Sequence, residues 1–96
     1  MISRYHPAAQ KDVYGILDYY DALSPELGDA FYDELMEAVT NASLFSTRFS
    51  KVTNRFRRCN LKRFPYHFLF EEHDWGIRIM VIKHNKRRPD YGMIRK

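Results

Sequence analysis

The segment YHFLFEEHDWGIRIMVIKH, residues 66–84, decides the fold. Its first seven residues are rich in aromatic side chains, as strands are. His73-Asp74-Trp75-Gly76 has the composition of a turn, and residues 77–84 form the most hydrophobic stretch of the chain. The segment therefore predicts a β-hairpin with strands at 66–72 and 77–84, the second of them central in the sheet.

Residue alternation predicts which hairpin side chains share a face. In the second strand, the two expected sets are Ile77, Ile79 and Val81 on one face and Arg78, Met80, Ile82 and His84 on the other. Tyr66, Phe68 and Phe70 alternate along the first strand. They could stack on RNA bases, but alternate aromatics on a central strand are more often core, which is the interpretation favoured here.

Two helical patterns precede the hairpin. Residues 2–5 are expected to form a short strand, after which Pro7 suits the first position of a helix that ends near Leu23. Ser24 is a suitable N-cap for a second helix that reaches about Phe45. Apolar residues at helical spacing mark the inner faces: Val13, Ile16, Leu17 and Tyr20 in the first helix, and Leu27, Phe31, Leu35, Ala38, Val39 and Ala42 in the second. The short turn between them predicts an αα-hairpin.

A third long strand is expected between the helices and the hairpin. Residues 46–54 have the composition of a loop, and residues 55–63 alternate as a strand does. The predicted faces are Phe56, Arg58, Asn60 and Lys62 against Arg57, Cys59, Leu61 and Arg63. The order is β-α-α-β-β-β in an α+β domain spanning residues 1–96, with the helical hairpin packed on one face of an antiparallel sheet.

Charge is distributed unevenly along the 96 residues, whose net charge is +4. Residues 1–47 contain two basic and eight acidic side chains, whereas residues 48–96 contain fourteen basic and four acidic ones. Such asymmetry favours an anionic partner for the second half. The simpler alternative, a solvated basic face without a partner, stays open.

Several classes of function find no support in the sequence. No glycine-rich phosphate loop, paired-cysteine zinc spacing or HExxH motif occurs, so no metal and no cofactor is predicted. Cys59 lies within a predicted strand and is expected in the core. The chain lacks an apolar run of membrane-spanning length and an apolar secretory leader, and its single cysteine cannot form an internal disulfide. A cytoplasmic protein without membrane contact is expected.

One basic and aromatic set is the candidate active surface: Lys62, Arg63, His84, Arg87, Arg88 and Tyr91. Strand ends and the tail could bring these residues to one edge of the sheet. Arg and Lys side chains can stabilise the charge of a phosphorane, and Tyr or His can transfer a proton to or from a ribose hydroxyl. The alternative is a surface that only docks a nucleic acid or a protein.

The ordered set of motifs resembles the RelE/ParE superfamily of type II toxin–antitoxin (plasmid stabilisation) toxins, the ParE-like branch above all. The similar segments are Leu61–Phe70 with its Phe-Pro-Tyr, Ile77–His84, Arg87-Arg88-Pro89-Asp90-Tyr91, Tyr19-Tyr20, and Phe31 with Leu35. The resemblance covers nearly the whole chain and implies the β-α-α-β-β-β fold and a cognate antitoxin. Exposed apolar residues expected to contact that antitoxin are Tyr14, Tyr19, Phe45 and Phe49.

The resemblance implies one of two activities. ParE-like members inhibit DNA gyrase, and RelE-like members are mRNA interferases that cleave mRNA in the ribosome without a metal. Lys62 matches a basic phosphate-stabilising position of the nucleases and Tyr91 their C-terminal tyrosine, but Asn85 stands near an expected Arg. The departure at Asn85 favours the gyrase inhibitor. A basic nucleic-acid-binding module without toxicity is a further alternative, against which the acidic helical hairpin argues.

Overall fold

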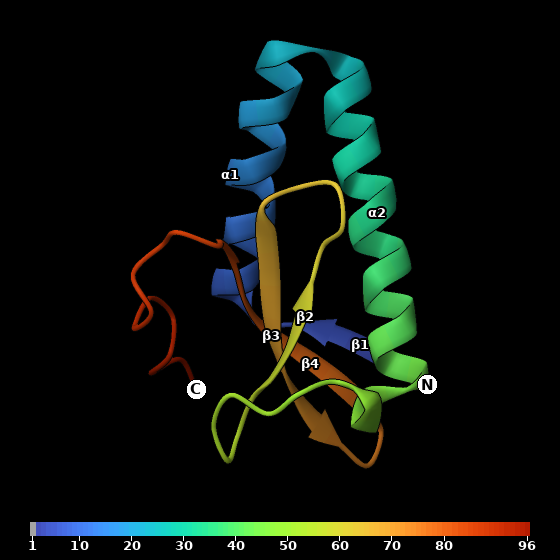
Figure 1. Ribbon diagram of the computed structural model, residues 1–96, viewed down its shortest axis with the longest axis vertical. Coiled ribbons are helices and arrows are strands. Elements are labelled where there is room, and N and C mark those ends of the chain that lie inside the picture. The colour runs from blue at the N-terminus through green and yellow to red at the C-terminus, as the bar shows by residue number, and fades with distance from the viewer. Residues whose placement is uncertain (1) are drawn as a thin grey trace.

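A computed structural model describes residues 2–96 (Figure 1). The elements follow in the order β1 (Ile2–Tyr5), α1 (Pro7–Leu23), α2 (Pro25–Leu44), the 3₁₀ turn η1 (Ser46–Arg48), β2 (Arg57–Asn60), β3 (Tyr66–His73) and β4 (Gly76–His84). Figure 1 shows the two helices side by side along the sheet, with the tail following β4 on the side of α1. The predicted α+β architecture and the order of its elements are confirmed.

The sheet has the strand order β1-β4-β3-β2. The predicted hairpin is confirmed, because β3 pairs antiparallel with β4, and β2 pairs antiparallel with β3. The edge strand β1 pairs parallel with β4, so that the sheet is mixed where an antiparallel one was expected. Parallel neighbours need a long crossover connection, which the whole helical hairpin and the β2–β3 meander provide between β1 and β4.

Both helices begin as their sequences predict. The Ala8 N–H donates to Nδ1 of His6 at 2.9 Å ahead of Pro7, and the Leu27 N–H donates to Oγ of Ser24 at 3.1 Å ahead of Pro25. Each bond satisfies a helical N–H that has no carbonyl partner within the helix. No helix within residues 2–96 combines the length and apolarity needed to cross a bilayer.

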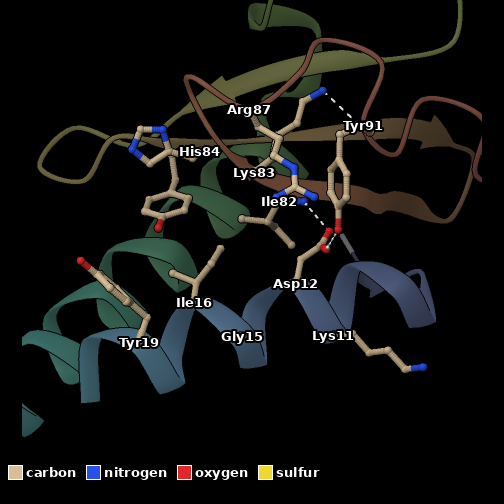
Figure 2. A pocket seen from close by; sticks show the side chains of 11 residues that line it. Lys11, Asp12, Gly15, Ile16, Tyr19, Ile82, Lys83, His84, Arg87 and Tyr91 are labelled. Carbon is tan, nitrogen blue, oxygen red and sulfur yellow. Dashed lines mark hydrogen bonds between the residues drawn. The ribbon is translucent and has the colours of Figure 1, made fainter. Parts of the chain in front are cut away.

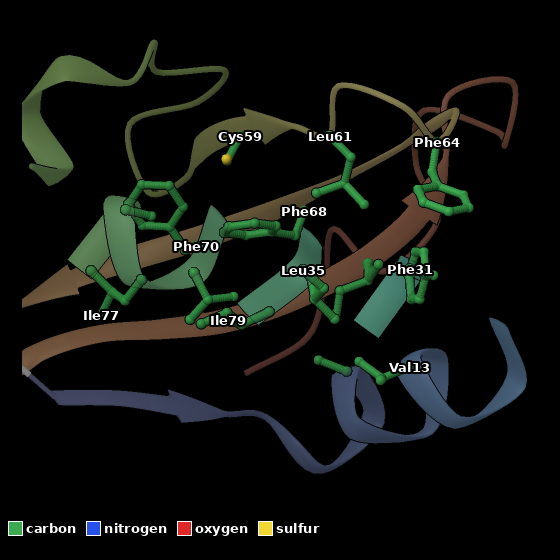
Figure 3. Packing of buried hydrophobic residues seen from close by; sticks show 14 residues of the cluster. Val13, Phe31, Leu35, Cys59, Leu61, Phe64, Phe68, Phe70, Ile77 and Ile79 are labelled. Carbon is green, nitrogen blue, oxygen red and sulfur yellow. The ribbon is translucent and has the colours of Figure 1, made fainter. Parts of the chain in front are cut away.

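The main core lies between the helices and the sheet (Figure 3). Phe31 and Leu35 from α2 meet Phe68 and Phe70 from β3, and all four are fully buried. The expectation that the alternate aromatics of β3 form core is confirmed for Phe68 and Phe70, while Tyr66 packs at the rim. Burial of this apolar surface is the main contribution to the stability of so small a domain.

A smaller core covers the opposite face of the sheet and corrects one predicted face. Phe56, Leu69, Met80 and Val81 are buried there, with Tyr91 and Met93 of the tail packed against them. The pairing register shifts between Leu69 and Phe70, whose partners on β4 are Val81 and Ile79. This β-bulge places Met80 as an extra residue and inverts the alternation beyond it. Val81 therefore leaves the face of Ile79, and Ile82 joins it.

Strand β2 is shorter than predicted. Residues 55–63 were expected to form it, but only Arg57–Asn60 pair with β3, and Lys62 and Arg63 lie in the following loop. The reason is a contact with a segment distant in sequence, since the backbone N–H groups of Lys62 and Arg63 donate to the carboxylate of Glu34 on α2. The expected loop at 46–54 contains η1 and an isolated bridge between Lys51 and Arg57.

Candidate functional site

A pocket opens between α1, the end of β4 and the tail (Figure 2). We call it the tail pocket, and its volume is about 330 Å³. Its lining residues are Lys11, Asp12, Gly15, Ile16, Tyr19, Tyr66, Ile82, Lys83, His84, Arg87 and Tyr91. Figure 2 shows Lys11 pointing away from the other side chains, whereas Arg87 lies over the ring of Tyr91.

Asp12 is the residue that fastens the tail to α1. Its carboxylate accepts hydrogen bonds from the Tyr91 hydroxyl at 2.8 Å and from Nη1 of Arg95 at 2.6 Å. It also accepts from the Ile82 N–H at 3.1 Å, and only 7 % of its side chain is exposed. A buried carboxylate is stable when paired and hydrogen-bonded in this way. We call this group of Asp12, Tyr91 and Arg95 the tail clasp.

Lys83 holds the tail from the sheet side. Its buried ammonium donates to the carbonyls of Pro89 at 2.9 Å and Tyr91 at 3.1 Å. Burial, followed by the nearby charge of Arg58, lowers the pKa of Lys83. Partial burial alone would lower the pKa of Arg95, but its bond and ion pair with Asp12 outweigh that effect and raise it. The tail is therefore a fixed part of the structure.

Tyr91 presents its ring to two arginines. The guanidinium of Arg87 lies 4.0 Å from the ring centroid and that of Arg95 lies 5.0 Å from it. Such cation–π contacts stabilise a guanidinium over the ring. Because the Tyr91 hydroxyl is already bound to Asp12, the ring is held as a platform that positions Arg87 beside the pocket.

His84 stands at the other wall of the tail pocket. Its Nδ1 accepts from the Lys86 N–H at 3.0 Å, and its ring meets that of Tyr66 edge-on, with centroids 5.1 Å apart. The bond at Nδ1 assigns the proton of the neutral imidazole to Nε2. Nε2 is therefore the ring nitrogen that is left to donate a hydrogen bond.

Lys62 and Arg63 line a different hollow, the α2 groove, of about 510 Å³. The other lining residues are Asp33, Glu34, Glu37, Ala38, Asn41, Phe49, Cys59, Asn60 and Leu61. Glu34 accepts from the Lys62 N–H at 2.6 Å and from Nε of Arg63 at 3.1 Å. Partial burial opposes the shift, but hydrogen bonds from Arg63 and Lys62 lower the pKa of Glu34. Glu34 thus compensates the charge of Arg63.

The six sequence-predicted residues do not line one pocket. The structure brings His84, Arg87 and Tyr91 together in the tail pocket, and it places Lys62 and Arg63 in the α2 groove. Arg88 lines neither, because its side chain is 77 % exposed and lies 3.6 Å from Asp90. The backbone links the two regions, since the Asn85 N–H donates to the Pro65 carbonyl at 2.9 Å. The six candidate residues are therefore divided between two hollows and an exposed position on the tail.

Sequence reasoning missed Asp12, Gly15 and Lys83. Asp12 was counted only among the eight acidic residues of the first half, although it lies beside Val13 and four residues before Ile16 on the inner face of α1. That position at the border of an apolar stripe was the available signal. Lys83, in a hydrophobic strand, carried the same kind of signal, because a lysine there must find partners for its ammonium.

The chemistry available in the tail pocket is recognition more than proton transfer. The Tyr91 hydroxyl donates to Asp12, and Oδ1 of Asn85 accepts a hydrogen bond from Nδ1 of His67 at 2.8 Å. Burial, only partly offset by the bond to Asn85, lowers the pKa of His67. Cys59 is core, as predicted, and burial raises the pKa of its thiol to about 11. Within residues 2–96, no group of three His, Cys, Asp or Glu side chains could hold a metal ion.

Comparison with known proteins agrees with the fold and the sequence motifs. The family described as the ParE toxin of the type II toxin–antitoxin system parDE matches residues 4–89. The chain is 24 % identical over 88 residues to Toxin ParE2 of Mycobacterium tuberculosis strains CDC 1551 / Oshkosh and H37Rv, a match that covers 91 % of this chain and 84 % of the relative.

A solved structure, the chromosomal ParDE TA system from P. aeruginosa, has the same fold. It superposes with a TM-score of 0.75 at 22 % identity, over 88 % of this chain and 95 % of that one. The chain belongs to the ParE toxin family of type II toxin–antitoxin systems, within the RelE/ParE superfamily. The resemblance seen in the sequence is confirmed.

Proposed function

We propose that this ParE family toxin inhibits DNA gyrase through a protein surface and is neutralised by a cognate antitoxin. Family membership supports both parts. The observation that carries the choice of target is the tail clasp, in which the hydroxyl of Tyr91 is bound to Asp12 at 2.8 Å. A nuclease would need that hydroxyl, or another group of suitable pKa, within reach of a ribose 2′-hydroxyl.

The arrangement of the basic residues also supports a gyrase inhibitor over an mRNA interferase. Phosphodiester cleavage requires cations and a proton-transfer group around one phosphate. Lys62, the residue at the nuclease-like basic position, lines the α2 groove, whereas Tyr91 lines the tail pocket. Asn85, at the position where an arginine is expected, faces His67 through its amide oxygen. The interferase is the alternative that the experiment below tests.

The antitoxin surface is proposed on the helical hairpin and the α2 groove. Tyr14, Tyr19 and Phe45 are 57 %, 59 % and 42 % exposed, as expected for contacts with a partner. Phe49 is less available than expected, because it is partly buried against Phe70 with centroids 5.8 Å apart. Antitoxins that fold on contact lay amphipathic segments into grooves of this kind.

Expression of the chain in cells tests the target. Filamentation with DNA-damage induction is expected for gyrase inhibition, and co-expression of the antitoxin is expected to restore growth. The double variant Arg87→Ala with Arg88→Ala should reduce toxicity while binding of the antitoxin persists. Translation arrest with codon-phased mRNA cuts would replace the proposed target by the ribosome, and growth arrest of unchanged strength in the double variant would exclude the tail as the active surface.

A further inference from the structure

We infer that the tail pocket receives an acidic side chain, flanked by an apolar one, from a protein segment of the toxin's target. This inference rests on the proposed function, because it assigns the pocket to the target; Tyr19, which lines the pocket, also belongs to the neighbouring surface proposed for the antitoxin. Three features of the pocket carry it: a positioned arginine, an apolar floor, and a flanking helix whose acids repel an extended polyanion.

Arg87 is held in place before any partner arrives. Its guanidinium stacks 4.0 Å from the centroid of Tyr91, whose hydroxyl is in turn fixed by Asp12. Arg87 makes no ion pair in the part of the chain that the structure describes, unlike Arg88 and Arg95. A stacked guanidinium exposes its edge, the geometry that binds a carboxylate through two N–H groups. Preorganisation of this kind lowers the entropic cost of binding.

The floor of the pocket is apolar and kept open by a glycine. Ile16, Ile82 and Tyr66 line it, and Gly15 of α1 borders it. A Cβ added at Gly15 would meet no atom within 4 Å, so the glycine serves no close packing contact within the chain. Glycine in a helix interior is less favourable than alanine. Its structural consequence here is space for a side chain of another molecule.

Charge in the neighbourhood selects a peptide over a nucleic acid. The pocket offers the guanidinium of Arg87, while the ammonium of Lys83 is occupied by tail carbonyls. Asp18 lies three residues after Gly15, on the same side of α1, and is exposed. A strand of phosphates leaving the pocket along α1 would pass this carboxylate. A short acidic and apolar peptide needs only the local cation and the apolar floor.

Direct binding tests the pocket without reference to the target. The probe is the peptide acetyl-Gly-Glu-Phe-Gly-amide, titrated into the isotope-labelled full chain and followed by NMR. We expect saturable shifts of the Gly15 amide and the Arg87 Nε–H signals, with affinity reduced at least tenfold by Arg87→Ala. Lys86→Ala removes one positive charge from the same exposed segment, and Lys86 lines neither the tail pocket nor the α2 groove, so this variant is the matched control and should bind as wild type. An equal loss of peptide affinity in Arg87→Ala and Lys86→Ala would overturn the inference. So would NMR signals that do not shift at millimolar peptide.

Filling the pocket is the second test. Gly15→Leu places a side chain in the open space, and Ala22→Leu introduces the same side chain at an exposed position of α1 outside the pocket. Gly15→Leu should abolish peptide binding and lower growth inhibition at least tenfold, while the antitoxin still co-purifies with it. Ala22→Leu should leave peptide binding, growth inhibition and antitoxin co-purification unchanged. Full toxicity and peptide binding in a folded Gly15→Leu protein would contradict the assignment.

The two tests separate the pocket from the proposed target. If Arg87→Ala and Gly15→Leu lose toxicity while wild type leaves gyrase supercoiling unaffected, the pocket stands and gyrase is not the target. If wild type inhibits gyrase and both variants inhibit it equally well, the target stands and the pocket assignment fails. Binding of a single-stranded oligonucleotide, in preference to the peptide and dependent on Arg87, would identify a nucleic-acid site and refute the peptide.

Discussion

Tyr91 donates a 2.8 Å hydrogen bond to Asp12, which joins the tail to the first helix across 79 positions of the chain. The same carboxylate pairs with Arg95 and accepts the N–H of Ile82. The tail is thus held at both the helix and the sheet. The tail after His84, which the sequence suggests is a basic extension, instead forms one wall of the tail pocket.

Asp12→Asn should lower the free energy of unfolding by about 3–5 kcal/mol, because it leaves the charge of Arg95 buried without its partner. Asp18→Asn, an exposed position on the same helix, should change it by less than about 0.5 kcal/mol. Urea denaturation of both variants measures the difference. Equal stability of the two would mean that the tail clasp contributes nothing to folding.

Leu35→Ala should cost about 2–5 kcal/mol as a truncation in the main core, where Leu35 is fully buried. Leu44→Ala provides the control, since Leu44 is 54 % exposed near the end of the same helix. The melting temperature should fall strongly for the first variant and little for the second. An unchanged value for Leu35→Ala would show that the register of α2 is wrong.

Acid should weaken the contact between Glu34 and the β2–β3 loop. Hydrogen bonds from Arg63 and Lys62, opposed by partial burial, lower the pKa of Glu34 in the folded state. Its contribution to stability is therefore present above the pKa of the unfolded chain and is lost as the pH falls below about 5. Glu34→Gln should show a shallower loss of stability between pH 6 and about 3.

In Glu34→Gln, the loss of stability with falling pH should be reduced and not abolished, because two other carboxylates also have lowered pKa values. Against the effect of burial, hydrogen bonds from Arg55 and His73 lower the pKa of Glu71. Hydrogen bonds from Ser46 and Arg57 lower the pKa of Glu72. Denaturant titrations across the pH range provide the comparison. Parallel curves for wild type and Glu34→Gln would contradict a lowered pKa at Glu34.

Substitution by alanine should change stability in opposite directions at two glycines, Gly15 and Gly76. Gly15→Ala should stabilise the chain by about 0.4–1 kcal/mol, since the new Cβ meets open space within α1. Gly76→Ala should destabilise it by more than that, because φ is +147° and the Cβ would lie 1.8 Å from the Ile2 carbonyl oxygen. Thermal unfolding of both proteins checks the signs, and a stable Gly76→Ala variant would argue against the pairing of β1 with β4.

Much of the fold could be predicted from sequence because local signals and global packing agree. The caps at His6-Pro7 and Ser24-Pro25 fix both helix starts, and Phe68 and Phe70 mark the core face of β3. The face of Val81 could not be predicted, because a bulge at Met80 shifts the alternation without any local sequence signal.

The candidate site was only partly predictable, because it depends on contacts between distant segments. His84, Arg87 and Tyr91 were identified by residue type and position at the end of a strand and in the tail. Lys62 and Arg63 were placed with them on the assumption of a long β2. That assumption fails because the backbone N–H groups of Lys62 and Arg63 donate hydrogen bonds to Glu34 of α2. Local alternation carries no information on such a partner.

The most direct test of the proposed toxin function is a supercoiling assay with purified DNA gyrase and relaxed plasmid. Addition of the chain should inhibit supercoiling in proportion to its concentration, and prior incubation with the cognate antitoxin should restore it. Supercoiling that continues unchanged at a large excess of the folded chain would contradict gyrase as the target.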